Sequence, residues 1–172
     1  MSAMTRRFGT TTDGAEVRPE PASPAVRGAA VAAAGGLFAA GALHVVWGFS
    51  PWPLDSRAEF ASVVVGVDES QLPSAPLTFA VAGLLGAAAG LVATGARPAS
   101  RLGRSWPVRA GLWTVSGALA VRGLGGLAAS GLGLGSKPDG FRHWDLRLYS
   151  PLCVTLGGLT GYVALRTRRH QP

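Results

Sequence analysis

The chain has 172 residues, a length typical of one domain, with 48% hydrophobic and only 15% charged residues. Soluble domains carry about 25% charged residues, so this composition argues against an ordinary soluble fold. The formal net charge of +7 at pH 7 comes without a basic amphipathic face or a nucleic-acid-binding motif, and we therefore exclude nucleic acid as a partner.

Residues 1–27 are polar, rich in Thr, Pro, Arg and Glu, and show no apolar periodicity, so we expect a disordered tail. The Arg6-Arg7 pair is similar to the start of a twin-arginine signal, but the next apolar block begins only at residue 28. That block is also longer than the roughly 7–15 apolar residues of a signal peptide. The sequence therefore predicts an uncleaved membrane anchor.

Four apolar blocks follow, each close to the length of about 17–25 helical residues that crosses a bilayer. The predicted spans are 28–48, 76–96, 110–131 and 148–166. Arg122 lies in the third span, where a central Arg costs roughly 2.5–3.5 kcal/mol on the insertion scale while each Leu or Val returns about 0.3–0.6. We therefore expect this span to insert together with its neighbours. The predicted fold class is an all-α, integral membrane four-helix bundle.

The membrane domain is expected over residues 28–166, with a short basic tail at 167–172. Lys and Arg are distributed unevenly around the spans, which predicts their orientation. Eleven arginines lie in the two tails and between the second and third spans: Arg6, Arg7, Arg18, Arg27, Arg97, Arg101, Arg104, Arg109, Arg166, Arg168 and Arg169. The connection after the third span is mixed, with Lys137, Arg142 and Arg147. We expect both termini on the cytoplasmic side of a bacterial cell membrane.

The long first connection, residues 50–75, is then an outer loop, and it contains only Arg57 among four carboxylates. It opens on the rigid SPWPL turn and contains an apolar stretch, EFASVVVGV, at residues 59–67. This stretch is too short to span a bilayer. We expect it to lie at the membrane interface or to fold over the mouth of the bundle.

Small residues recur at four-residue spacing in every span, and in lipid such rows allow helices to pack closely. The rows are Ala32, Gly36, Ala40 and His44; Gly86 and Gly90; Thr114, Ala118, Arg122 and Gly126; and Tyr149, Cys153, Gly157 and Gly161. Because residues at i and i+4 share a helix face, we expect these faces to point into the bundle. The same rows can instead join chains, so a homo- or hetero-oligomer is an alternative.

Ionisable side chains inside a membrane are costly and mark functional sites by default. With the predicted orientation, His44, Arg122, Asp145 and Tyr149 are expected to meet in one polar site in the outer half of the bilayer, with Asp145 as the counter-charge of Arg122. In a catalytic interpretation, His44 carries a proton and Arg122 binds an anion or a carbonyl. In a structural interpretation, the same groups join helices and Tyr149 anchors the membrane interface.

The start of the fourth helix is ambiguous. Ser150-Pro151 is typical of a helix N-cap followed by Pro at the first helical position. A helix that begins there leaves Asp145 and Tyr149 in the preceding loop.

Metal and cofactor chemistry finds no support in the sequence. The three histidines lack metal-ligand spacing, and GLGGLA at 123–128 lies inside a span with no strand before it, which excludes a dinucleotide site. Cys153 is the only cysteine, so no intramolecular disulfide or CxxC pair can form. We therefore expect no metal and no cofactor.

Several segments together resemble the bacterial four-span membrane family catalogued as domain of unknown function 3995. They are LHVVW at 43–47, WP at 52–53, VVGV at 64–67 with Pro73, RGLGG at 122–126 and FRHWDLRLYSPLC at 141–153, the last being the most specific. The resemblance covers roughly residues 30–165, and the family pattern maps onto His44, Trp47, Arg122, Asp145, Tyr149 and Pro151. It implies four spans and no established activity.

Three functions stay open at this point. The leading hypothesis is a membrane-embedded binding protein or enzyme acting on a lipophilic molecule at the outer side. The first alternative is a non-catalytic subunit or scaffold. The second is a small transporter, but transporters usually place a coupling acid within their spans, and none of the four blocks contains Asp or Glu.

Overall fold

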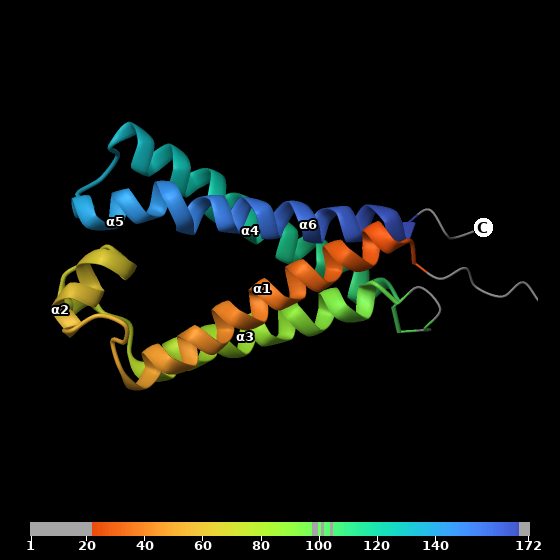
Figure 1. Ribbon diagram of the computed structural model, residues 1–172, viewed down its shortest axis with the longest axis horizontal. Coiled ribbons are helices and arrows are strands. Elements are labelled where there is room, and N and C mark those ends of the chain that lie inside the picture. The colour runs from red at the N-terminus through yellow and green to blue at the C-terminus, as the bar shows by residue number, and fades with distance from the viewer. Residues whose placement is uncertain (1–21, 98–99, 101, 104, 169–172) are drawn as a thin grey trace, which may run out of the picture.

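The computed structural model describes residues 22–97, 100, 102–103 and 105–168, and this part of the chain is helical, without a strand (Figure 1). Four helices are long and apolar enough to cross a membrane: Pro24–Phe49, Ala75–Gly95, Trp106–Leu132 and Asp139–Thr167. The predicted all-α four-span fold is confirmed, and the chain is a multi-pass membrane protein. Of the tails expected at 1–27 and 167–172, residues 1–21 and 169–172 lie outside the described residues, and residues 24–27 and 167–168 belong to helices.

The first helix, α1 (Pro24–Phe49), begins before the predicted span and takes its first turn from the expected tail. The Ser23 hydroxyl accepts a hydrogen bond from the Val26 amide at 3.4 Å, and Pro24 fits the first turn, where its missing N–H is not needed. The helices α3 (Ala75–Gly95) and α4 (Trp106–Leu132) also carry Pro in the first turn. The helices α1 and α4 therefore begin at this local signal, before the predicted apolar blocks at 28 and 110, whereas α3 begins next to its predicted start at 76.

The fourth span is one continuous helical segment made of α5 (Asp139–Trp144), the π-helical turn η3 (Asp145–Tyr149) and α6 (Ser150–Arg168). Ser150 is therefore not an N-cap, and Asp145 and Tyr149 lie on the helix. In the π turn, the Ser150 amide donates to the Asp145 carbonyl, five residues back. Pro151 follows directly and has no amide hydrogen, so a local departure from α-helical bonding is expected before it.

The four long helices form two pairs, α1 with α3 and α4 with α6, which cross at one end of the bundle and separate toward the other (Figure 1). We call the first the terminal end, because α1 begins and α6 ends there. We call the other the loop end; it carries α5 and the short elements α2 (Arg57–Phe60), η1 (Ala61–Val65) and η2 (Glu69–Gln71).

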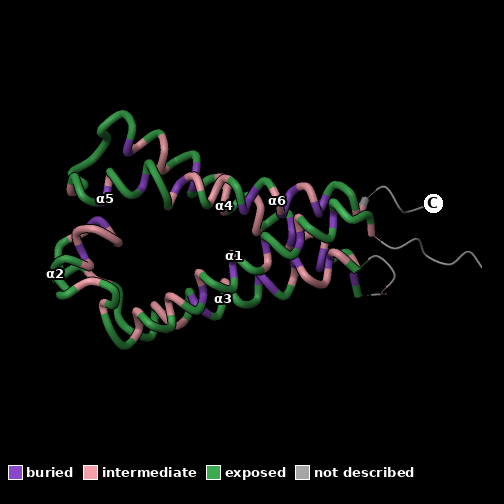
Figure 2. The backbone as a smooth tube through the Cα atoms, in the orientation of Figure 1, coloured by how far each residue is buried: buried purple, intermediate pink, exposed green. Residues whose placement is uncertain are grey.

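Buried residues gather in the half of the bundle near the terminal end (Figure 2). Leu37 of α1, Val92 of α3, Leu112 of α4 and Val163 of α6 are fully buried there. All four helices contribute to this core, so it holds the two pairs together where they cross. At the loop end the pairs do not share such a core.

The helices of the second pair approach to backbone contact. The Ser116 hydroxyl of α4 donates to the Gly157 carbonyl of α6 at 2.9 Å. A Cβ atom at Gly157 would lie only 3.2 Å from the backbone of α4, at Ser116 and Ala120. The row in the fourth span therefore faces the bundle as predicted, with Gly157 and Gly161 buried.

The small-residue prediction is wrong for α3 and partly wrong for α1 and α4. In α1, Ala32 is exposed, whereas Ala33, Leu37 and Gly41 are buried. Gly86 and Gly90 of α3 are exposed with open space around them, while Ala89 and Val92 are buried. In α4, Thr114 and Ala118 are exposed as well. Alanine and valine still allow close approach and bury more apolar surface than glycine does, which explains why a different face of α3 packs inward.

Candidate functional site

A cavity of about 840 Å³ opens at the loop end between the two helix pairs. Its size falls within the roughly 300–1,000 Å³ that is usual for small-molecule sites. One wall comes from α1 and α3, and the other from α4, α5 and the connection between them. Segment 57–66, which we call the lid, adds Phe60, Val64 and Val65 to the lining.

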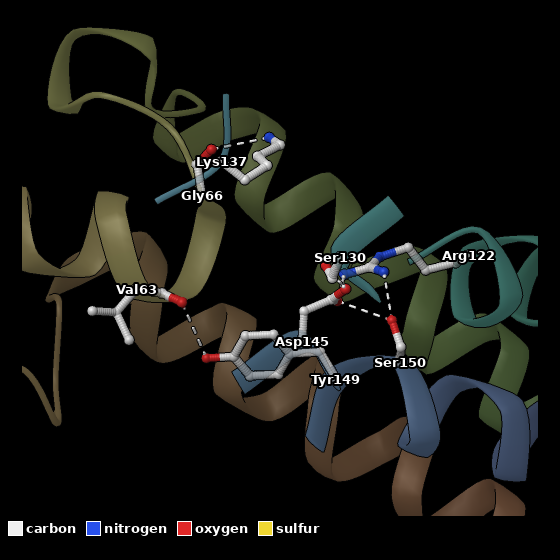
Figure 3. Close-up of polar contacts among 8 residues, drawn as sticks. All are labelled: Val63, Gly66, Arg122, Ser130, Lys137, Asp145, Tyr149 and Ser150. Carbon is white, nitrogen blue, oxygen red and sulfur yellow. Dashed lines mark hydrogen bonds and ion pairs between the residues drawn. The ribbon is translucent and has the colours of Figure 1, made fainter. Parts of the chain in front are cut away.

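The central polar group on the second wall is the carboxylate of Asp145 (Figure 3). Its Oδ1 accepts hydrogen bonds from Arg122 Nη2 at 2.9 Å and from the Ser150 hydroxyl at 3.0 Å, and its Oδ2 accepts from the Ser130 hydroxyl at 2.6 Å. Arg122 Nη1 also donates to the Ser150 hydroxyl at 3.3 Å. The prediction that Asp145 is the counter-charge of Arg122 is confirmed.

The π turn explains how Ser150 reaches Asp145. On a regular α-helix, two residues five apart point in directions that differ by roughly 140°. The extra residue per turn in η3 brings the two side chains together, and Ser150, fully buried, completes the polar group that Arg122 and Ser130 supply from α4. We call Arg122, Ser130, Asp145 and Ser150 the polar cluster.

Gly126 makes room for the polar cluster on the surface of α4. A Cβ atom at this position would collide with the Ser150 hydroxyl and with Arg122 Nη1, and would lie 3.0 Å from Asp145 Oδ2. The neighbouring Gly125 also lines the cavity, but a Cβ there would meet nothing within 4 Å. Of the two, only Gly126 has to be a glycine for the polar cluster to pack in this way.

His44 lines the same cavity from the opposite wall. Its Nδ1 lies 2.8 Å from the Ala40 carbonyl, which can only accept, so Nδ1 carries the hydrogen and Nε2 is the basic nitrogen of the neutral ring. The ring packs edge-to-face on Trp47 at 5.0 Å between centroids. Within the described chain, no hydrogen bond joins His44 to Arg122 or Asp145, so the two walls stay separate.

Tyr149, predicted to share one polar site with His44, Arg122 and Asp145, does not line the cavity. Its hydroxyl points to the lid and donates to the Val63 carbonyl at 3.5 Å (Figure 3). Two further contacts hold the lid: Lys137 Nζ donates to the Gly66 carbonyl at 2.9 Å, and the Phe141 ring packs against Gly66. The apolar stretch of the first loop thus folds over the mouth of the bundle, one of its two predicted places.

Four residues of this region escaped the sequence analysis as site residues: Ser130, Ser150, Lys137 and Arg142. Arg142 donates from Nε and Nη2 to the Ser130 carbonyl at 3.2 and 3.1 Å. A signal for Ser130 was present, since it lies eight residues after Arg122 and therefore on the same face of α4. Lys137 and Arg142 were recorded only as charges of a mixed connection.

The arrangement is suited to binding more than to proton transfer at the carboxylate. Both oxygens of Asp145 are occupied, and the side chain is only 1% exposed. Arg122 is 46% exposed and has further N–H groups beyond the two that Asp145 and Ser150 accept. No group of three or more His, Cys, Asp or Glu side chains is placed to hold a metal ion among the residues that the structure describes.

One comparison with known proteins gives a match. The sequence pattern of the family described as Protein of unknown function (DUF3995) matches residues 37–160, which include both walls of the cavity and the lid. Neither the curated proteins nor the solved structures give a match.

Proposed function

We propose a function from the geometry of the site, because the chain belongs to the DUF3995 family of proteins of unknown function. This multi-pass membrane protein binds a lipophilic small molecule in the cavity at the loop end. The observation that carries the proposal is the cavity of about 840 Å³ with apolar walls and a few convergent polar groups. A concave, mostly apolar site with a small number of placed polar side chains is the usual form of a small-molecule site.

Binding is favoured over transport by the packing of the other half of the bundle. The cavity lies at the loop end, whereas the core near the terminal end is closed by fully buried side chains such as Leu37, Leu112 and Val163. A transporter needs access from both sides of the membrane in turn. Transporters usually carry a coupling acid within their spans, and Asp145, on the fourth spanning helix, is held by three donors and is not free to carry a proton.

Binding is also favoured over a purely structural role of the polar residues. The polar cluster is complete within α4 and the fourth helix, and it does not extend to the opposite wall. The ion pair therefore does not join the two helix pairs at the loop end. The cluster stabilises the contact of α4 with the fourth helix, and this structural role does not account for the open space between the two helix pairs.

The test compares two glycines of the same helix. Gly125→Leu places a side chain in the cavity, whereas Gly117→Leu places the same side chain on an exposed position outside it; a Cβ atom at either position would meet nothing within 4 Å. Both variants replace an exposed helical glycine, so their effects on helix propensity match. The protein is purified in a mild detergent, extracted with organic solvent, and the extract is analysed by mass spectrometry.

We expect a lipophilic compound at near-stoichiometric amount in wild type and in Gly117→Leu, and a clear loss in Gly125→Leu. Equal retention in all three proteins would overturn the proposal, and so would the absence of any retained compound from wild type. In that case the polar cluster only stabilises the contact between α4 and the fourth helix, and the non-catalytic subunit becomes the better interpretation.

We also propose that the loop end faces the outside of the cell, on the strength of the Arg-rich sequence near the terminal end. Cys153, the only cysteine, is replaced by Ala, and a single cysteine is then introduced by Ser136→Cys at the loop end or by Ala25→Cys at the terminal end; both positions are exposed. A membrane-impermeant maleimide added to intact cells should label only the first protein. Labelling of the second alone would reverse the orientation.

A further inference from the structure

Building on the proposed function, we propose that the ligand is an anionic amphiphile. Its acidic head group is bound by Lys137 and Arg142, and its apolar chain lies along the wall that α1 and α3 provide. The inference depends on the charges that line the cavity and on their distribution between its two walls.

The cavity lining carries an excess of positive charge. It includes four cationic side chains, those of Arg57, Arg122, Lys137 and Arg142, and a single carboxylate, that of Asp145. A cleft lined mainly by cations focuses a positive potential that attracts anions. The lining is therefore complementary to an anionic ligand.

Asp145 cannot neutralise this excess. Its carboxylate is saturated by three donors and pairs with Arg122. Through Ser130 the cluster also touches Arg142, whose guanidinium donates to the Ser130 carbonyl while the Ser130 hydroxyl donates to Asp145. Arg142 thus contacts a neutral backbone oxygen and not the carboxylate, and Asp145 does not neutralise its charge.

Two of the four cations also form ion pairs with acids that do not line the cavity. Asp139 is 3.9 Å from Arg142 and Glu69 is 4.0 Å from Arg57, but both acids are exposed, and exposed ion pairs contribute little. Lys137 donates to the Gly66 carbonyl and lies over the Phe141 ring at 5.5 Å, and both of these partners are neutral. Lys137 and Arg142 therefore have N–H groups left for a head group.

The opposite wall is apolar. Trp47 of α1 and Leu77 and Val81 of α3 line it, and its only ionisable side chain is His44. Val121 extends the apolar lining on α4, one residue before Arg122. A free anion would leave this surface without a partner, whereas an alkyl or isoprenoid chain on the anion would cover it.

The experiment measures head-group preference in the purified full-length protein by native mass spectrometry. Two pairs of probes are used, phosphatidylglycerol with phosphatidylcholine and oleate with oleyl alcohol. The two members of each pair have the same hydrocarbon chains and differ in the charge of the head group. Each pair is offered at equal concentration in detergent. The first pair tests a lipid of the bilayer as the source, and the second tests a free single-chain acid.

The variant Lys137→Gln/Arg142→Gln removes the two proposed head-group contacts. Arg147→Gln is the control, because Arg147 is an exposed cation on the same helical segment that does not line the cavity. Lys137→Arg/Arg142→Lys keeps both charges and shows whether charge alone restores the preference. A loss of structural support would lower the binding of all probes, whereas loss of a head-group contact changes the ratio within a pair.

We expect wild type to prefer the anionic member of at least one pair by about tenfold or more, as charge-assisted hydrogen bonds allow. The ratio should fall close to one in Lys137→Gln/Arg142→Gln and stay high in Arg147→Gln and in the charge-keeping variant. Equal binding within both pairs, or a preference that survives Lys137→Gln/Arg142→Gln, would overturn the inference. Either result leaves the proposed function standing if Gly125→Leu still displaces the bound compound.

Discussion

The guanidinium of Arg122 and the carboxylate of Asp145 lie 2.9 Å apart, yet they are unequally buried, with 46% of the arginine side chain exposed and 1% of the aspartate side chain. The pair is therefore asymmetric. If Asp145 is removed, the Arg122 guanidinium still reaches the cavity and a ligand in it. If Arg122 is removed, the Asp145 carboxylate stays buried with two hydroxyl groups, those of Ser130 and Ser150.

The first prediction follows from this asymmetry. Arg122→Gln should destabilise the protein by about 1–3 kcal/mol, the cost of taking one hydrogen-bond donor from a buried acceptor, because Asp145 keeps the Ser130 and Ser150 hydroxyl groups. Asp145→Asn should cost less, because the charge it leaves unpaired is half-exposed. Thermal unfolding in detergent micelles, followed by circular dichroism, measures both.

The double variant Arg122→Gln/Asp145→Asn provides the control. With both charges removed, it should be more stable than Arg122→Gln alone, since no buried charge is left without a partner. If Asp145→Asn proved the more harmful single change, the buried carboxylate would not be the costly member of the pair.

The second prediction concerns two adjacent glycines of α4. Gly126→Ala forces a methyl group into the polar cluster, where it collides with the Ser150 hydroxyl and the Arg122 guanidinium. Gly125→Ala meets nothing within 4 Å and should stabilise the helix by about 0.5–1 kcal/mol. The two variants should therefore shift the melting temperature in opposite directions. Equal shifts would mean that Gly126 is not required for the packing of the cluster.

Much of the fold was predictable because a membrane imposes simple rules on a sequence. Four apolar blocks of spanning length gave four helices. The Arg122–Asp145 pair was predictable for a similar reason, because a charge inside a membrane needs a partner and Asp145 was the acid nearest the start of the fourth span.

The remaining features depend on local backbone geometry and on packing between helices, which the spacing of residue types along the sequence does not reveal. The bond from Ser150 to Asp145 requires a π turn, whereas the Ser-Pro sequence by itself is typical of a helix start. The inward face of α3 was mistaken because small residues occur on several of its faces, and only the neighbouring helices decide which face is buried. Lys137 and Arg142 belong to the connection between the third and fourth predicted spans, whose folding the sequence pattern does not reveal, and the cavity brings them together.

The third prediction concerns the junction of the lid with α5. Gly66 has a φ of +74°, in the left-handed region, and a Cβ atom there would lie 2.6–2.9 Å from the Phe141 ring. Gly66→Ala should therefore release the lid and speed hydrogen exchange at the amides of Gly66 and Val67, which donate to the Ala61 carbonyl. Measurement of these amides by mass spectrometry or NMR gives the change directly.

Gly135→Ala is the matched control for Gly66→Ala. Gly135 has a similar φ of +81°, but a Cβ atom there would meet nothing within 4 Å. It should cost only the conformational term of about 1–2 kcal/mol and leave exchange in the lid unchanged. If both variants affected the lid amides equally, the contact of Gly66 with Phe141 would not be what holds the lid.

The fourth prediction separates two roles of Tyr149. The Tyr149 hydroxyl contacts the Val63 carbonyl at 3.5 Å, at the limit of a hydrogen bond, so Tyr149→Phe should change the free energy of unfolding by less than about 0.5 kcal/mol. Because Tyr149 does not line the cavity, the same variant should leave ligand retention unchanged. Tyr149→Ala also removes the ring that packs near Phe141, with centroids 6.1 Å apart, and should increase exchange at the lid amides. If Tyr149→Phe instead lowered ligand retention while the lid amides stayed protected, the hydroxyl would contact the ligand and not only the lid.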